Sequence, residues 1–114
     1  MKVLVCGGRN YTDTERVEHV LNSLHAEKRI TNIITGAAQG ADALAQAWAI
    51  SNRIAVARYP ANWKEHGRSA GPRRNKIMLE TERPQIVVAF PGGKGTKDMI
   101  AKADAARISV VVVS

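Results

Sequence analysis

The stretch Ile86–Met99, IVVAFPGGKGTKDM, decides the fold, because it holds a strand, a glycine turn and a helix start without interruption. Residues 86–90 are apolar on both faces, which is typical of a central parallel strand covered by helices on each side. Pro91 ends the strand, and Gly92, Gly93 and Gly95 are expected to adopt positive φ and to approach a ligand closely. Thr96 is predicted to open a helix. The unpaired N–H groups and partial positive charge of a helix start favour an anion, most naturally phosphate.

The same order of strand, small-residue turn and helix occurs twice more. The first strand is predicted at Lys2–Cys6, followed by a glycine turn at 7–11 and a capping box at Thr12–Glu15. The helix after it carries an apolar stripe at Val17, Val20, Leu21 and Leu24. The second strand, 32–35, leads through the turn 36–42 into an alanine-rich helix over about 41–51.

The remaining chain completes an alternating pattern. A third strand is predicted at 54–57, a long functional or ligand-covering loop at 58–71, and a helix with Pro72 at its first position and its end near Glu82. The last helix is expected to face inward with Met99, Ile100, Ala103 and Ala106, before a final strand at 109–113. Residues 1–114 are therefore predicted to form a single-domain, Rossmann-like three-layer α/β fold with a five-stranded, mainly parallel sheet.

In such folds ligands bind at the carboxyl ends of the strands, near the point where the strand order reverses. The glycine-bearing loops after strands one, two and four are expected to meet along that edge, which favours a nucleotide-like ligand. Two familiar phosphate-binding modes are absent. The dinucleotide fingerprint does not follow the first strand, and Gly93-Lys94-Gly95-Thr96 lacks the four-residue loop that precedes the lysine in a Walker motif.

Composition favours an anionic partner. The net charge is +7, from 17 Lys and Arg against 10 Asp and Glu, and five cations fall within 13 residues: Lys64, Arg68, Arg73, Arg74 and Lys76. A nucleic-acid backbone and a phosphorylated small molecule both fit this cluster. No apolar stretch reaches the roughly 18 residues of a membrane span, and the basic start leads into a strand rather than a signal peptide. With a single cysteine, a cytoplasmic protein without a membrane partner is expected.

Several single residues have two interpretations each. Asp42 fits a general acid or a sugar-hydroxyl acceptor, and equally an acid that favours a first helical turn. Adjacent helical residues point in different directions, so only one of Arg73 and Arg74 is expected to be functional. Trp63 fits either base stacking or anchoring of its loop. Cys6 fits a small apolar filler better than a nucleophile, and the three histidines show no metal-ligand spacing, so no metal site is expected.

Four segments in order, GGRNY at 7–11, GAAQGAD at 36–42, AGPRRN at 70–75 and PGGKGT at 91–96, resemble the SLOG superfamily, and in particular its small stand-alone YspA-like branch. That superfamily also contains the LOG phosphoribohydrolases and the DprA/SMF DNA-processing proteins. The resemblance implies a Rossmann-like fold that binds nucleotides or nucleotide-derived molecules, often as a homodimer or higher homo-oligomer, with no cofactor required beyond the ligand. The residues that would line the ligand on this match are Gly7, Gly8, Arg9, Gly36, Gly40, Arg74, Asn75, Gly92, Gly93, Gly95 and Thr96.

One position departs from the LOG pattern. The LOG motif resembles PGGxGTxxE, whose glutamate is catalytic for cutting an N-glycosidic bond, whereas this chain has Met99 there. Asp98 lies one residue earlier, about 100° around a helix. The first hypothesis is therefore a module that senses or sequesters a phosphorylated, nucleotide-derived small molecule. The alternative is an N-glycosidase or phosphoribohydrolase acting on a nucleoside monophosphate, with Asp98 or Asp42 as its carboxylate. A third, DprA-like binding of single-stranded DNA, is disfavoured because only 4% of residues are aromatic.

Overall fold

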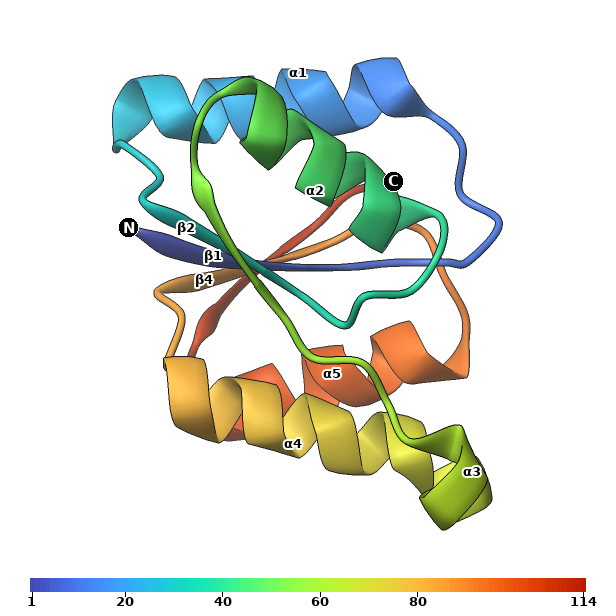
Figure 1. Cartoon of the computed structure of the whole chain (residues 1–114). Coiled ribbons are helices and arrows are strands. Elements are labelled where there is room, and N and C mark those ends of the chain that lie inside the picture. The colour runs from blue at the N-terminus through green and yellow to red at the C-terminus, as the bar shows by residue number, and fades with distance from the viewer.

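The computed structural model describes residues 1–114 and contains one parallel sheet with the strand order β3-β2-β1-β4-β5. The strands are β1 (Lys2–Cys6), β2 (Asn32–Thr35), β3 (Ala55–Arg58), β4 (Ile86–Ala89) and β5 (Ser109–Val112). The helices are α1 (Thr14–Glu27), α2 (Ala41–Ser51), the one-turn α3 (Trp63–His66) with the 3-10 turn η1 (Gly67–Ser69), α4 (Ala70–Glu82) and α5 (Lys94–Ala105). Figure 1 shows α1 and α2 on one face of the sheet and α4 and α5 on the other. The predicted Rossmann-like three-layer α/β fold is confirmed.

The two faces of the sheet each bury an apolar cluster, and β1 illustrates why its sequence is apolar throughout. Val3 and Val5 pack in the cluster beneath α1 and α2, while Leu4 packs in the cluster beneath α4 and α5. All three side chains are fully buried. A central parallel strand covered on both sides has no solvent-facing position, which explains the continuous apolar run. No helix of the structure is both long enough and apolar enough to cross a membrane.

Three helix starts differ from the sequence expectation. Asp13, not Thr12, caps α1, since its carboxylate accepts a hydrogen bond of 3.0 Å from the N–H of Arg16. Helix α4 begins at Ala70, two residues before Pro72. Helix α5 begins at Lys94 with Gly93 as its N-cap, so Thr96 lies inside the first turn rather than opening the helix. In each case the chain enters the helix through a residue other than the strongest local start signal.

The predicted long loop at 58–71 is wrong in part. From residue 63 onward it forms α3 and η1, which lead directly into α4. Asn62 caps α3 by accepting a hydrogen bond of 3.1 Å from the N–H of Glu65. A helix of four residues shows no sustained apolar period, so periodicity could not identify it. At other boundaries β3 lies one residue later than predicted, β4 and β5 end one residue earlier, and Ala106 is an exposed C-cap rather than an inward-facing residue.

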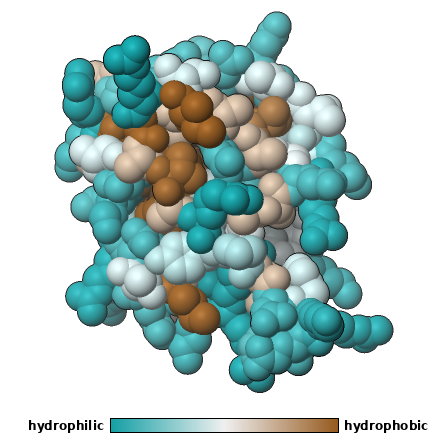
Figure 2. Space-filling model, viewed as in Figure 1, coloured by the Kyte–Doolittle hydropathy of each residue, from teal (hydrophilic) through white to brown (hydrophobic).

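Each outer strand has one edge without a strand partner, since β3 pairs only with β2 and β5 only with β4. In the view of Figure 1, Figure 2 shows hydrophobic side chains gathered over β3 and the neighbouring part of α2, within a mainly hydrophilic surface. Exposed large apolar residues include Ile50 at the end of α2 and Val112 on β5. Apolar surface is therefore left near both edges of the sheet, and the homo-oligomer expected from the resemblance stays a prediction.

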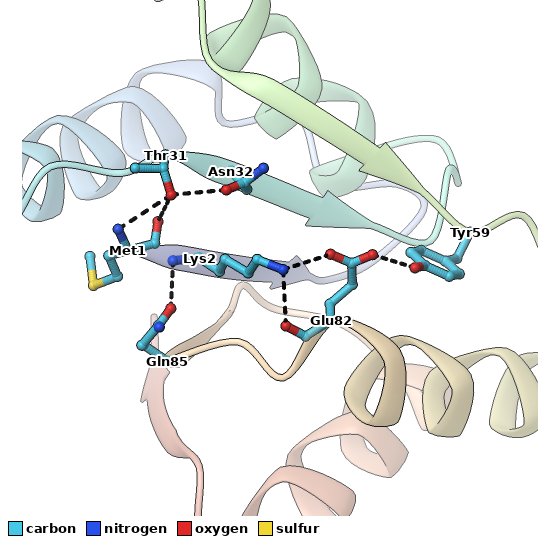
Figure 3. A network of polar contacts seen from close by, with 7 residues as sticks. All are labelled: Met1, Lys2, Thr31, Asn32, Tyr59, Glu82 and Gln85. Carbon is cyan, nitrogen blue, oxygen red and sulfur yellow. Dashed lines mark hydrogen bonds and ion pairs between the residues drawn. The ribbon is translucent and has the colours of Figure 1, made fainter.

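A polar network fastens the start of β1 to its neighbours (Figure 3). The Nζ atom of Lys2 lies 3.4 Å from a carboxylate oxygen of Glu82, at the end of α4. The other carboxylate oxygen of Glu82 accepts a hydrogen bond from the Tyr59 hydroxyl. Tyr59 follows β3, so the network joins the sheet edge, the central strand and α4. The members are Met1, Lys2, Thr31, Asn32, Tyr59, Glu82 and Gln85. The network holds the side chain of Tyr59, which directly precedes the cleft residue Pro60.

Candidate functional site

A cleft of about 1130 Å³ lies at the carboxyl ends of β1, β2 and β4, next to the point where the strand order reverses. Its walls come from the loops after these three strands, from the segment between β3 and α4, and from the first turns of α4 and α5. The expectation that the three glycine-bearing loops meet at one edge is confirmed. All but one of the sequence-predicted site residues line this cleft; the exception is Gly40.

The start of α5 is open toward solvent and the cleft. Gly93 caps the helix without a side-chain hydrogen bond, and the first helical bond runs from the N–H of Lys97 to the carbonyl of Gly93. A Cβ added at Gly93 or Gly95 would meet no atom within 4 Å. The expected positive φ at Gly92, Gly93 and Gly95 is wrong, because the positive-φ glycines are Gly40 and Gly67. What Gly93 and Gly95 provide is uncovered backbone at a helix N-terminus.

The other glycines of the first, second and fourth-strand loops make room for one another. Gly8 donates a hydrogen bond of 2.8 Å to the carbonyl of Pro91, and its own carbonyl accepts one of 3.2 Å from the N–H of Ala41. A Cβ on Gly92 would overlap the N–H of Gly8 and the Thr96 hydroxyl, and one on Gly40 would overlap the Gly8 carbonyl. These glycines are needed because three backbone segments touch. Gly40 packs against the Gly8 carbonyl and does not line the cleft.

Arg74 reaches across the floor of the cleft to the second loop. Its Nη1 donates to the carbonyl of Gly36 at 2.7 Å and to that of Tyr59 at 3.3 Å. A Cβ on Gly36 would overlap the guanidinium, so Arg74 could keep its present position only with glycine at residue 36. Burial lowers the pKa of Arg74, although Asp42 opposes that shift. Arg73 instead lies exposed and donates a hydrogen bond to Ser69. The two adjacent arginines therefore point in different directions, as expected, and Arg74 is the one that lines the cleft.

Asn75 holds the start of α5 in place. Its side chain is 3% exposed, and its amide nitrogen donates to the Gly95 carbonyl at 3.2 Å and to Asp98 at 3.0 Å. Its amide oxygen accepts from Arg74 Nε at 3.0 Å. The second carboxylate oxygen of Asp98 accepts from Lys102 at 2.6 Å. A continuous chain of hydrogen bonds therefore links the second loop, α4 and α5, and the polar atoms of Asn75 are occupied within the protein.

Positions 98 and 99 face different surroundings, about 100° apart around α5. Met99 is fully buried in the apolar cluster beneath α4 and α5 and does not line the cleft, whereas Asp98 does. Burial raises the pKa of Asp98, but the hydrogen bonds from Lys102 and Asn75 outweigh it and hold that pKa below its ordinary value. The carboxylate presented to the cleft is therefore an ionised Asp98. The position that carries the glutamate in the LOG pattern faces the core in this chain.

Two further titratable groups lie deep in the cleft wall. Asp42 is 6% exposed, and its Oδ2 accepts a hydrogen bond of 3.2 Å from the N–H of Ala38. Burial raises the pKa of Asp42, while the Ala38 N–H and Arg74 partly offset that effect. Burial, together with Asp42, raises the pKa of the Cys6 thiol to about 12. Cys6 stays protonated near neutral pH, which favours the filler interpretation over a nucleophile.

Several cleft residues were not identified as site residues from the sequence. Trp63, whose role was left open, is 49% exposed, and the Arg9 guanidinium carbon lies 5.7 Å from its ring centroid. Arg68 and Lys94 also line the cleft, which therefore presents four cations, with Arg9 and Arg74, against the carboxylates of Asp42 and Asp98. The signals were available: Arg68 belongs to the basic cluster, and Lys94 lies within the glycine turn.

The geometry defines a Rossmann-like α/β protein with a cationic cleft at its topological switch point. The family can be named from comparison. Residues 1–66 match the model of the YspA, cpYpsA-related SLOG family, YAcAr. The Gene 61 protein of Mycobacterium phage D29 is 31% identical over 118 residues, covering 96% of this chain and 94% of that protein. The chain belongs to this SLOG family, as the four motifs predicted, and membership suggests a nucleotide-related ligand or activity.

Proposed function

We propose that this protein binds a phosphorylated, nucleotide-derived small molecule in the cleft and acts as a sensing or sequestering module. The observation that carries the proposal is the start of α5, where Gly93 and Gly95 leave backbone N–H groups uncovered in a cleft with four cations. A helix N-terminus combines free donors with a partial positive charge, both of which favour phosphate. The hydrogen bonds of Asn75 to Gly95 and Asp98 hold this turn before any ligand arrives, which reduces the entropy lost on binding.

The residue at position 99, a buried methionine, favours binding without hydrolysis. The LOG pattern requires a carboxylate there, and Met99 packs in the core with Leu4 and Met78. A family member that keeps the phosphate-binding turn and lacks this carboxylate retains affinity without that route of catalysis. Binding of the ligand would then be read out as a change in stability or assembly.

A second candidate function follows from the two carboxylates in the cleft. The pKa of Asp42 is raised, mainly by burial, and that of Asp98 is lowered by hydrogen bonds despite burial. Carboxylates whose pKa values are moved apart suit an acid and a base in one reaction. An N-glycosidase acting on a nucleoside monophosphate would use Asp98 to stabilise the oxocarbenium-like centre and Asp42 as proton donor.

The test is thermal unfolding of the protein with AMP, ADP, ADP-ribose, NAD, cyclic AMP and ribose 5-phosphate, followed by chromatography of each mixture for free base. A ligand at 100 times its dissociation constant adds about 2.7 kcal/mol of stability. Stabilisation with the ligand recovered intact supports the binding module, and release of base supports the glycosidase. A labelled single-stranded oligonucleotide is the third arm. Tight, steeply salt-dependent binding of DNA with no nucleotide effect would contradict both proposals.

A further inference from the structure

Two aromatic residues line the cleft, Tyr11 and Trp63, and Trp63 comes from the segment between β3 and α4. Its neighbours in the cleft wall are Pro60, Ala61, Arg68 and Gly71. Trp63 is the first residue of α3, which Asn62 caps. The ring edge of Trp63 lies beside Gly71, where an added Cβ would be 3.2 Å from the indole Cη2. One edge of the indole is thus fixed against α4, yet 49% of the residue remains exposed.

Arg9 faces the indole from the first loop. Its guanidinium carbon lies 5.7 Å from the ring centroid, and Arg9 takes part in none of the ion pairs of the chain. The Arg9 side chain is exposed and can move, whereas the Trp63 ring is held by α3 and Gly71. A planar group stacked between two others needs about 7 Å, twice the contact distance of about 3.5 Å between carbon atoms. The guanidinium carbon is closer to the ring centroid than this spacing, so Arg9 must move outward before a planar group fits between them.

We infer that Trp63 and Arg9 form the nucleobase subsite of this cleft, with the base stacked between the indole and the guanidinium. The inference rests on the proposed function and narrows it: the ligand is a base-bearing nucleotide rather than a sugar phosphate alone. Bases stack on aromatic rings and on guanidinium planes, and every base offers a π face. The subsite therefore accepts different bases, and the phosphate and ribose are held elsewhere in the cleft.

The experiment compares AMP with ribose 5-phosphate, which has the same phosphate and ribose without a base. Calorimetry is carried out on the wild-type protein and on the Trp63→Leu and Trp63→Phe variants. We expect Trp63→Leu to weaken AMP binding at least tenfold and to change ribose 5-phosphate binding less than twofold. Trp63→Phe should recover most of the AMP affinity, because phenylalanine retains a stacking ring. Thermal unfolding without ligand checks that each variant is folded.

Tryptophan fluorescence gives an independent readout. The only other tryptophan, Trp48, is buried beneath α1 and α2 and donates a hydrogen bond of 2.8 Å to Asn22. AMP should change the emission of the wild type, ribose 5-phosphate should not, and Trp63→Phe should show no change with either. The subsite would be overturned if Trp63→Leu lost the same factor of affinity for AMP and for ribose 5-phosphate, or if the wild type bound both equally well. Neither result would contradict the proposed phosphate site. A wild type that binds neither overturns the proposed function itself.

Discussion

Replacing Gly93 with aspartate separates the stability of the protein from its affinity for phosphate. Gly93 is the N-cap of α5, its φ is −105°, and a Cβ there meets no atom within 4 Å. Aspartate is a preferred N-cap residue, and exchange between it and glycine changes stability by only a few tenths of a kcal/mol. The Gly93→Asp variant should therefore fold as well as the wild type, or slightly better.

The same carboxylate should prevent anion binding. A capping aspartate accepts hydrogen bonds from the second and third residues of a helix, here Gly95 and Thr96, which are donors proposed for the phosphate. Two unit charges 4 Å apart near a protein surface repel with about 4 kcal/mol at an effective dielectric constant of about 20. Since each 1.4 kcal/mol is a factor of ten, the expected loss of affinity is on the order of a thousandfold.

The assay is calorimetric titration with AMP, paired with urea unfolding of each variant without ligand. Gly93→Asn is the matched control, because asparagine also caps a helix and carries no charge. We expect Gly93→Asn to lose affinity through competition for the N–H groups alone, and so to lose less than Gly93→Asp. A folded Gly93→Asp protein that binds AMP within threefold of the wild type would refute the placement of the phosphate at α5.

Four other outcomes are expected. Arg74→Lys keeps the charge but loses bonds to Gly36, Tyr59 and Asn75, so urea unfolding should show a loss of about 1–3 kcal/mol and calorimetry a loss of AMP affinity of about 1.5–3 kcal/mol. Asp98→Asn should leave AMP affinity within threefold and abolish any release of adenine seen by chromatography. Because burial raises the pKa of Asp42 in the fold, the ionised carboxylate destabilises it near neutral pH. Thermal unfolding of Asp42→Asn should thus show a gain over the wild type at pH 7 that shrinks as the pH falls toward 3.8, the ordinary pKa of aspartate. With its pKa raised from 9.0 to about 12, the Cys6 thiol should react slowly with a disulfide reagent at about pH 8 in the folded protein and rapidly in urea. The free energy of unfolding should fall as the pH rises above 9.0, because the thiol then ionises in the unfolded chain and stays protonated in the fold.

The fold could be predicted because its signals are local and repeated. Each buried strand is a short apolar run, and each is followed by a small-residue turn and an amphipathic helix, which together specify a parallel α/β sheet. Several of the errors lie at helix starts. Asp13 and Gly93 are the N-caps, whereas Thr12 and Thr96 were the residues predicted to start these helices. The path of the chain into a helix determines the N-cap together with the residue type.

The candidate site was harder to predict because glycine has several uses. The chain has nine glycines, and the sequence alone does not distinguish the roles of those in the loops. In the structure Gly93 and Gly95 face open space, whereas Gly92 and Gly40 are required by contacts with Gly8. Those contacts join segments more than thirty residues apart, and no local pattern reports them. The same reason left Trp63 ambiguous, because its two roles depend on where Gly71 and Arg9 lie.

The loss of the LOG glutamate and the retention of the glycine turn are compatible because the two features belong to different surfaces of α5. The turn contributes backbone donors, which require only Gly93, Gly95 and the hydrogen bonds of Asn75 to the first turn. Position 99 faces the core, about 100° around the helix from Asp98, and contributes apolar packing where an ionised side chain would be buried without a partner. The proposed carboxylate chemistry would therefore depend on the two carboxylates that line the cleft, Asp42 and Asp98, and the bonds of Asp98 to Lys102 and Asn75 keep it ionised and hold it in place. The proposed binding of phosphate at the turn uses backbone donors and needs no such carboxylate, so it is compatible with a methionine at position 99.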